Sequence, residues 1–122
     1  MKAWTVRQPW AGLIVDGIKD VENKKVRTHF RGRICVHAAQ KRWSGSEAED
    51  APASRHQIYL GAVIGTVEIV NCIRNSSSEW AIPGMWHWVL AEPRALRSPI
   101  PTPGRLGLWD FPDRRLPLRH LY

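Results

Sequence analysis

The chain of 122 residues is long enough for one domain with a core of its own and too short for two. Hydrophobic residues make up 43% of it and charged residues 24%, an ordinary globular composition that argues against wholesale disorder. No apolar run approaches the roughly 20 residues that span a bilayer, and the first residues lack the apolar segment of a secretory signal. We therefore expect a cytoplasmic protein with no membrane partner.

The positive charge of the chain is concentrated in one place. Eighteen Lys and Arg residues against eleven Asp and Glu residues give a formal net charge of +7. The excess lies in residues 24–42, a stretch with seven basic residues and no acidic one. Such a concentration favours a phosphate-rich partner, nucleic acid above all, although a basic face that only keeps the protein soluble gives the same pattern.

The chain begins with a strand pattern that changes to a helical one. Residues 2–6 alternate polar and apolar and predict a first strand. Over residues 9–17 the spacing becomes helical, with Trp10, Leu13 and Ile14 on one face. A proline opens this segment and a glycine closes it, which suits the two ends of a short helix.

Two further strands are expected in the basic part of the chain. Residues 18–27 predict a strand or strand-like segment, and a turn should follow at residues 30–33. In the next strand Ile34, Val36 and Ala38 should share one face, because side chains alternate across a strand.

The middle of the chain predicts a loop followed by a central strand. Residues 40–57 are polar and acidic and predict a mobile surface loop with room for one helical turn. Residues 61–73 form the longest β-rich run, apolar on both faces, so this strand should be central and could bend at Gly65.

The last part of the chain predicts two strands and a tail. The strands are expected at residues 86–90 and 106–109, joined by a stiff connection rich in proline at residues 99–104. Residues 112–122 are basic, interrupted by proline, and expected on the surface. Five or six strands with one early helix predict an α+β fold: a small, mostly antiparallel β-barrel with a variable helical or loop insertion.

The cysteines and histidines show no pattern typical of a metal site. Cys35 and Cys72 stand alone, so we expect buried, reduced thiols. The histidines have no mutual metal-ligand spacing, and the sequence predicts neither a metal nor a cofactor. His37 should lie on the strand face opposite Ile34 and Val36, in a structural rather than a catalytic role.

The common catalytic signatures are absent from the chain. It has no Gly-rich loop ending in Gly-Lys-Ser/Thr, no Gly-x-Ser-x-Gly, no His-Glu-x-x-His and no dinucleotide fingerprint. The commonest hydrolase and nucleotide-binding classes are therefore excluded.

One pattern near the start is more specific. Gln-Pro-Trp-Ala stands at residues 8–11, Gly-x-Lys-x-x-Glu at 17–22, and Arg-Gly-x-x-x-x-His-Ala at 31–38. Together with five later pieces they resemble the activating-signal-cointegrator homology (ASCH) domain over nearly the whole chain. The later pieces are Gly61–Gly65, Ser78–Trp80, Trp88–Leu90, Pro99–Pro101 and Gly107–Trp109.

The resemblance implies a fold and a function. The fold would be a PUA-like β-barrel over residues 1–111, followed by a basic tail at 112–122, with a cleft between the first helix and the sheet. Members of the family are expected to bind RNA or other single-stranded nucleic acid. Some bacterial relatives hydrolyse an acylated cytidine amide.

Lys19 and Glu22 are the central pair of candidate site residues. Because they are three apart, an extended strand would point them to opposite sides, and they can share a site only if the chain bends between them. Taken alone, they fit a surface ion pair worth less than about 1 kcal/mol. The resemblance implies a shared cleft instead, with Lys19 on a phosphate or a base carbonyl and Glu22 accepting from an exocyclic amine.

Three positions depart from the family pattern. Lys24 and Val26 stand where many relatives carry arginine and tryptophan, and Glu22 stands where the amidohydrolase relatives carry a nucleophilic threonine. A hydrolase of a modified cytidine or of RNA stays open as the alternative function. It would use Lys19 to polarise or protonate the substrate and Glu22 as a general base on water.

The tryptophans divide into candidates for stacking and candidates for the core. Trp10 could stack on a base, a contact worth roughly 1–3 kcal/mol, or pack within the helix face beside Leu13 and Ile14. Trp43, which follows two basic residues, could also stack or could close one end of the barrel, and Trp80 fits either role. The tryptophans expected in strands favour the core: Trp4, Trp86, Trp88 and Trp109.

The leading hypothesis is binding of RNA or other single-stranded nucleic acid in a basic cleft. Gln8 offers an amide to a base edge, although it could only cap the helix. A protein partner is possible, and the oligomeric state is open. The expected nucleic-acid contacts are Gln8, Trp10, Lys19, Glu22, Lys24, Lys25, Arg31, Arg33, Lys41, Arg42 and Trp43.

Overall fold

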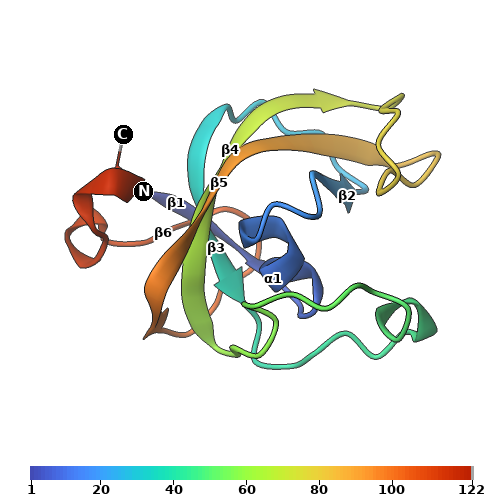
Figure 1. The fold of residues 1–122 in the computed structure, drawn as a ribbon. Coiled ribbons are helices and arrows are strands. Elements are labelled where there is room, and N and C mark those ends of the chain that lie inside the picture. Colours follow the sequence, from blue (N-terminus) through green and yellow to red (C-terminus); the bar gives the residue numbers. More distant parts are fainter. Residues whose placement is uncertain (122) are drawn as a thin grey trace.

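The computed structural model describes residues 1–121, and all of its strands belong to one sheet. Its single α-helix lies between the first two strands (Figure 1). The elements in chain order are β1 (Lys2–Val6), α1 (Trp10–Val15), β2 (Val21–Lys24), β3 (Gly32–Ala38), a 3-10 turn at Ser46–Ala48, β4 (Ala62–Ile73), β5 (Trp86–Pro101), β6 (Trp109–Asp110), and two 3-10 turns at Asp113–Arg115 and Leu118–His120.

The sheet has six strands in the order β2-β5-β4-β3-β1-β6. Strands β1 and β3 run parallel, and every other pair is antiparallel, so the sheet is mixed and mostly antiparallel as expected. Within residues 1–121 no strand pairing joins β2 to β6. The predicted α+β class is confirmed, whereas the closed barrel is not.

The predicted central strand is confirmed, and its glycine lets the helix approach it. β4 pairs with β3 on one side and β5 on the other, and the register shifts between Val63 and Gly65. A Cβ built at Gly65 would lie 2.8 Å from Cγ1 of Val15 in α1 and 2.6 Å from the Arg94 carbonyl oxygen. Only glycine therefore allows α1 to pack this closely on β4. Figure 1 shows the long strands β4 and β5 curving around the helix.

The core lies on both faces of the sheet. Ile34, Val36 and Ala38 of β3 are buried in the cluster that contains α1, which confirms their predicted common face. Cys35 points to a second cluster with Trp109 and other residues near the C-terminal part of the chain. Both cysteines are buried and free, as expected, and burial raises the pKa of the Cys35 thiol to about 12.

The proline-rich connection predicted at residues 99–104 is wrong, because β5 continues to Pro101. β2 pairs with β5 only as far as Val89, so over its second half β5 has β4 as its one strand neighbour among the described residues. Proline is tolerated there, since the missing N–H faces an edge without a partner strand. The last strand is also shorter and later than expected, at Trp109–Asp110.

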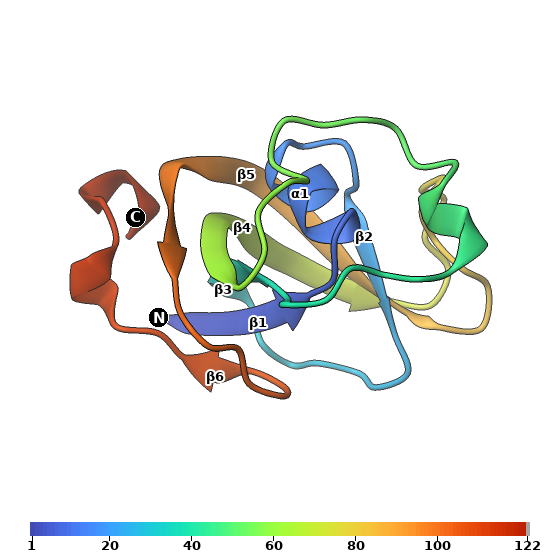
Figure 2. The ribbon, with the colours of Figure 1, turned by 90° about the horizontal axis from the view of Figure 1, so that it is seen from below.

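The C-terminal residues do more than lie on the surface. Leu116 is buried in the second core cluster, and His120 is completely buried. Figure 2 shows this segment at the end of the molecule opposite the 3-10 turn of the β3–β4 connection. No helix in residues 1–121 has the length and apolar character needed to cross a membrane.

Candidate functional site

The end of helix α1 bends the chain so that Lys19 and Glu22 meet. Gly17 adopts a φ of 79°, a left-handed conformation suited to glycine, and the backbone N–H groups of Ile18 and Lys19 both donate to the Leu13 carbonyl. The Lys19 ammonium then donates to the Glu22 carboxylate at 3.0 Å. Only 6% of the Lys19 side chain and 15% of the Glu22 side chain are exposed, so the pair is largely buried and is not the surface ion pair that the residues alone suggest.

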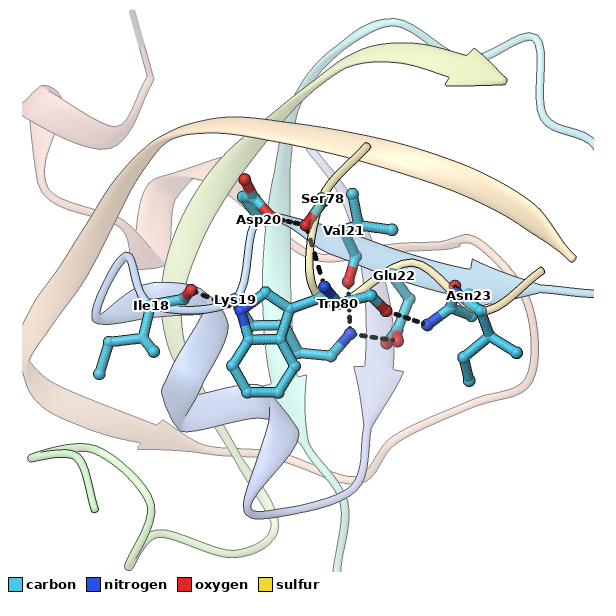
Figure 3. Close-up of polar contacts among 9 residues, drawn as sticks. Ile18, Lys19, Asp20, Val21, Glu22, Asn23, Ser78 and Trp80 are labelled. Atoms are coloured by element: carbon cyan, nitrogen blue, oxygen red, sulfur yellow. Dashed lines mark hydrogen bonds and ion pairs between the residues drawn. The ribbon is translucent and has the colours of Figure 1, made fainter. Parts of the chain in front are cut away.

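Asn23 fixes the loop between β4 and β5, residues 74–85, which we call the β4–β5 loop. Its amide nitrogen donates to the carbonyl of Trp80 at 2.9 Å, and its amide oxygen accepts from the backbone N–H of Ile82 at 2.9 Å. The indole N–H of Trp80 donates in turn to the Ile18 carbonyl at 2.9 Å. Figure 3 shows the Trp80 indole beside the Lys19 side chain, held by these contacts.

The loop between β3 and β4, residues 39–61, is fixed by the helix from the other side, and we call it the β3–β4 loop. Gln8 is completely buried, and its amide nitrogen donates to the carbonyls of His56 at 2.8 Å and Tyr59 at 3.0 Å. The Asp16 carboxylate accepts from the backbone N–H of His56 at 2.9 Å and contacts the His56 ring. Gln8 therefore positions a loop in this structure rather than facing solvent.

A cleft of about 450 Å³ lies between these two loops. Three indoles line it: Trp10 from the start of α1, Trp43 from the β3–β4 loop and Trp80 from the β4–β5 loop. The rings of Trp10 and Trp80 meet edge to face, with centroids 6.4 Å apart. The remaining lining residues are Lys19, Glu22, Asn23, Glu47, Asp50, Ala51, Pro52, Glu79, Ala81, Ile82 and Met85.

The charged groups that line the cleft are mainly acidic, which corrects the expectation of a basic cleft. Its ionisable lining residues are one lysine, already paired with Glu22, and four carboxylates. The additional carboxylates come from the two loops, and only the first of these loops was expected on the surface, at residues 40–57. These carboxylates are Glu47, Asp50 and Glu79.

Apart from Lys19, none of the predicted basic contacts lines the cleft. Lys24 directly follows the lining residue Asn23, and its ammonium lies 5.6 Å from the ring centre of Trp88. Lys25 is exposed one residue further on. Lys41 and Arg42 are also exposed and directly precede the lining residue Trp43. We call these four residues, Lys24, Lys25, Lys41 and Arg42, the basic rim. The term refers to their place in the chain, within two residues of a residue that lines the cleft.

Arg31 and Arg33 are not brought to the cleft. Arg31 is exposed and donates to the carbonyls of Thr28 and Phe30. Arg33 is partly buried and donates to the Thr66 hydroxyl at 3.1 Å. Burial and the nearby Arg94 guanidinium lower the pKa of Arg33.

Comparison with known proteins decides the family of the chain. The model of the ASCH domain matches residues 5–100, a range that contains every residue lining the cleft. The chain belongs to the ASCH domain family. It is also similar to Activating signal cointegrator 1 of Homo sapiens and of Mus musculus, each 24% identical over 128 aligned residues. The alignment covers 90% of this chain and 22% of each relative, so the chain spans about a fifth of their length.

The site of this ASCH domain gives no support to the hydrolase alternative. Glu22 occupies the place of the nucleophilic threonine, and its carboxylate is held by the Lys19 ammonium. None of the described residues that line the cleft carries a hydroxyl or a thiol. A mechanism that depends on such a nucleophile has no group to supply it at the cleft.

Asn23 was not among the residues expected from the sequence, although it stands between two of them. Its role depends on two backbone groups nearly sixty residues away, which no local pattern reveals. Trp80 fitted either a core or a binding role, and the structure places it in the wall of the cleft. Of the expected contacts, the structure gathers four around one cavity: Trp10, Lys19, Glu22 and Trp43.

Proposed function

We propose that this ASCH domain, which we place in the PUA-like superfamily, binds single-stranded nucleic acid, RNA above all. One unpaired base enters the cleft, and the adjoining phosphates lie on the basic rim. The observation that carries the proposal is the meeting of Trp10, Trp43 and Trp80 around one cavity of about 450 Å³. Indoles are the side chains on which unpaired bases stack, and the volume lies within the range of small-ligand pockets.

The charge distribution supports this orientation of the nucleotide. Phosphate is repelled by the carboxylates that line the cleft, so the base rather than the backbone should enter it. Lys25 and Lys41 are exposed, and each stands two residues along the chain from a lining residue, Lys25 after β2 and Lys41 in the β3–β4 loop. Flexible ammonium groups at these places suit contacts to successive phosphates without reading the sequence.

Binding can be tested by fluorescence anisotropy with a labelled single-stranded RNA of about ten nucleotides. Trp43 is 41% exposed, so Trp43→Ala should leave the fold intact and weaken binding about 5- to 100-fold, the range of one lost stacking contact. Ile58→Ala is the matched control, because Ile58 is 73% exposed in the same loop and does not line the cleft.

The salt dependence of the same titration tests the basic rim. The double variant Lys25→Ala with Lys41→Ala should reduce the log–log salt slope by about 1.4, since each phosphate contact on a single strand contributes about 0.7. Lys2→Ala with Arg97→Ala removes the same charge elsewhere and should leave the slope unchanged. Binding that is absent for every single strand tested, or equal in Trp43→Ala and wild type, would contradict the proposal.

A further inference from the structure

The cleft combines aromatic walls with an excess of negative charge. Glu22 is neutralised by Lys19, but three carboxylates on the two loops, Glu47, Asp50 and Glu79, have no cation opposite them in the lining of the cleft. A neutral base gains only hydrogen bonds from these carboxylates, whereas a cation also gains from their net charge and from the indole faces.

Trp43 and Glu47 add a second observation that favours a cation. The indole N–H of Trp43 donates to the Glu47 carboxylate at 2.7 Å. A carboxylate bound to the N–H edge draws positive charge to that edge and leaves the ring face richer in electrons. An indole whose N–H is hydrogen-bonded to a carboxylate therefore attracts a cation to its ring face more strongly than a free indole does.

Resting on the proposed function, we infer that the cleft selects a base whose ring carries a positive charge, such as one quaternised by alkylation of a ring nitrogen. Such a nucleotide is positive at the base and negative at the phosphate. The protein has carboxylates in the cleft, and the cations Lys24, Lys25, Lys41 and Arg42 stand within two residues of its lining residues in the chain, which is the complementary order of charge.

The same basic rim argues against an alkylated ammonium on a basic peptide. Such a peptide would bring further positive charges against the rim while its ammonium occupied the cleft. The cleft is also shaped by three indoles around about 450 Å³, which gives space for a planar ring as well as for a small cation. A peptide therefore enters the experiment only as a competing outcome.

The experiment compares two nucleotides that differ in one methyl group and one charge. Binding of 7-methylguanosine monophosphate and of guanosine monophosphate is measured by tryptophan fluorescence quenching. The cationic nucleotide should bind about tenfold more tightly, a ratio within the usual strength of cation–π contacts. A short basic peptide with one trimethyllysine serves as the competing ligand.

Variants then assign the preference to the lining carboxylates. The triple variant combines Glu47→Gln, Asp50→Asn and Glu79→Gln. In it, the affinity for the methylated nucleotide divided by that for the unmethylated one should fall to about one third of the wild-type ratio or less. The amide oxygen of the glutamine at position 47 can still accept the hydrogen bond from Trp43. Glu49→Gln is the matched control, because Glu49 is exposed in the same loop and does not line the cleft. It should keep the full ratio.

The possible failures are distinguishable. Equal binding of the two nucleotides, or a preference that survives in the triple variant, overturns the inference and leaves the proposed base-binding function standing. Tighter binding of the trimethyllysine peptide overturns the assignment to a base. Failure of both nucleotides and of single-stranded RNA to bind overturns the proposed function itself.

Discussion

His120 shows how one residue can tie the C-terminal segment to the sheet. The Arg119 guanidinium donates to Nε2 of His120 at 3.2 Å, so the ring proton of the neutral histidine is on Nδ1. Nδ1 lies 2.8 Å from the Thr66 hydroxyl and donates to it. Burial, followed by the charges of Arg119, Arg33 and Arg94, lowers the pKa of His120 from 6.5 to about 4.

This pKa predicts a loss of stability in mild acid. Above pH 6.5 the histidine is neutral in the folded and the unfolded chain, and the free energy of unfolding does not depend on it. Between pH 6.5 and about 4 the unfolded chain binds the proton first, so the free energy of unfolding should fall, by at most about 3 kcal/mol. Burial lowers the pKa of His37 as well, and it should act in the same direction.

Urea unfolding at a series of pH values measures this effect. His120→Asn removes the titrating group. The free energy of unfolding of this variant should therefore depend less on pH between pH 6.5 and 4, and the smaller dependence that is left should come from His37. An unchanged pH dependence in the variant would show that His120 is not the group responsible.

At the scale of elements, the cleft exists because α1 and the segment before β2 hold two loops apart. The β4–β5 loop is fixed to β2 by Asn23, and to the segment before β2 by the Ser78 hydroxyl, which donates to the Asp20 carboxylate at 2.5 Å. The β3–β4 loop is fixed by Gln8 and Asp16. The tryptophans on these loops, Trp43 and Trp80, are therefore positioned by side chains that would not themselves stack on a base.

Asn23→Ala should therefore loosen the β4–β5 loop and cost roughly 1–2 kcal/mol of stability, because two backbone groups lose their partners. Amide hydrogen exchange should accelerate at residues 78–83 while β3 and β4 stay protected. Asn75→Ala is the control in the same loop, at an exposed position, and should change neither quantity. Equal protection of residues 78–83 in both variants would argue against the positioning role of Asn23.

At the scale of the whole molecule, the alternation of polar and apolar residues was sufficient to predict most elements. It placed β1, α1, β3 and the central strand β4 correctly, because burial on one or both faces leaves a period in the sequence. It could not show that β5 continues through Pro99 and Pro101. Proline is a strand breaker unless one edge lacks a partner, and that condition depends on tertiary structure.

The sequence predicted the aromatic residues of the candidate site but not the negative charge of its lining. Trp10, Lys19 and Glu22 stand in the motif near the start that resembles the family. Glu47 and Asp50 occur in the polar segment expected as a surface loop, and Glu79, although it stands in a later piece of the resemblance, was not among the expected contacts. The distribution of charge along the chain shows where basic residues are concentrated, but not whether their side chains line a cavity. The basic stretch is real, but none of its basic residues lines the cleft, and only the four of the basic rim stand next to lining residues in the chain.

The tail lies on the surface as predicted over most of its described residues, but it is anchored there by two buried side chains. Removing residues 112–122 would expose the core around Trp109 and take away Leu116 and His120, both buried. The truncated chain should lose about 3 kcal/mol or more of unfolding free energy, judged from the loss of one buried leucine and one buried hydrogen-bonded group. Leu118→Ala, at a position 72% exposed in the same tail, should stay within about 0.5 kcal/mol of wild type. A truncation as stable as that variant would show that the two buried side chains of the tail do not stabilise the fold.

The seven tryptophans provide one direct measurement of where a nucleotide binds. Each indole N–H gives its own signal in a proton–nitrogen correlation spectrum, and unlabelled single-stranded RNA can be titrated into the labelled protein. If a base enters the cleft, the indole signals of Trp10, Trp43 and Trp80 should shift, while those of the buried Trp4 and Trp109 stay in place. Shifts confined to indoles away from the cleft, or no shifts at saturating RNA, would contradict base binding between the two loops.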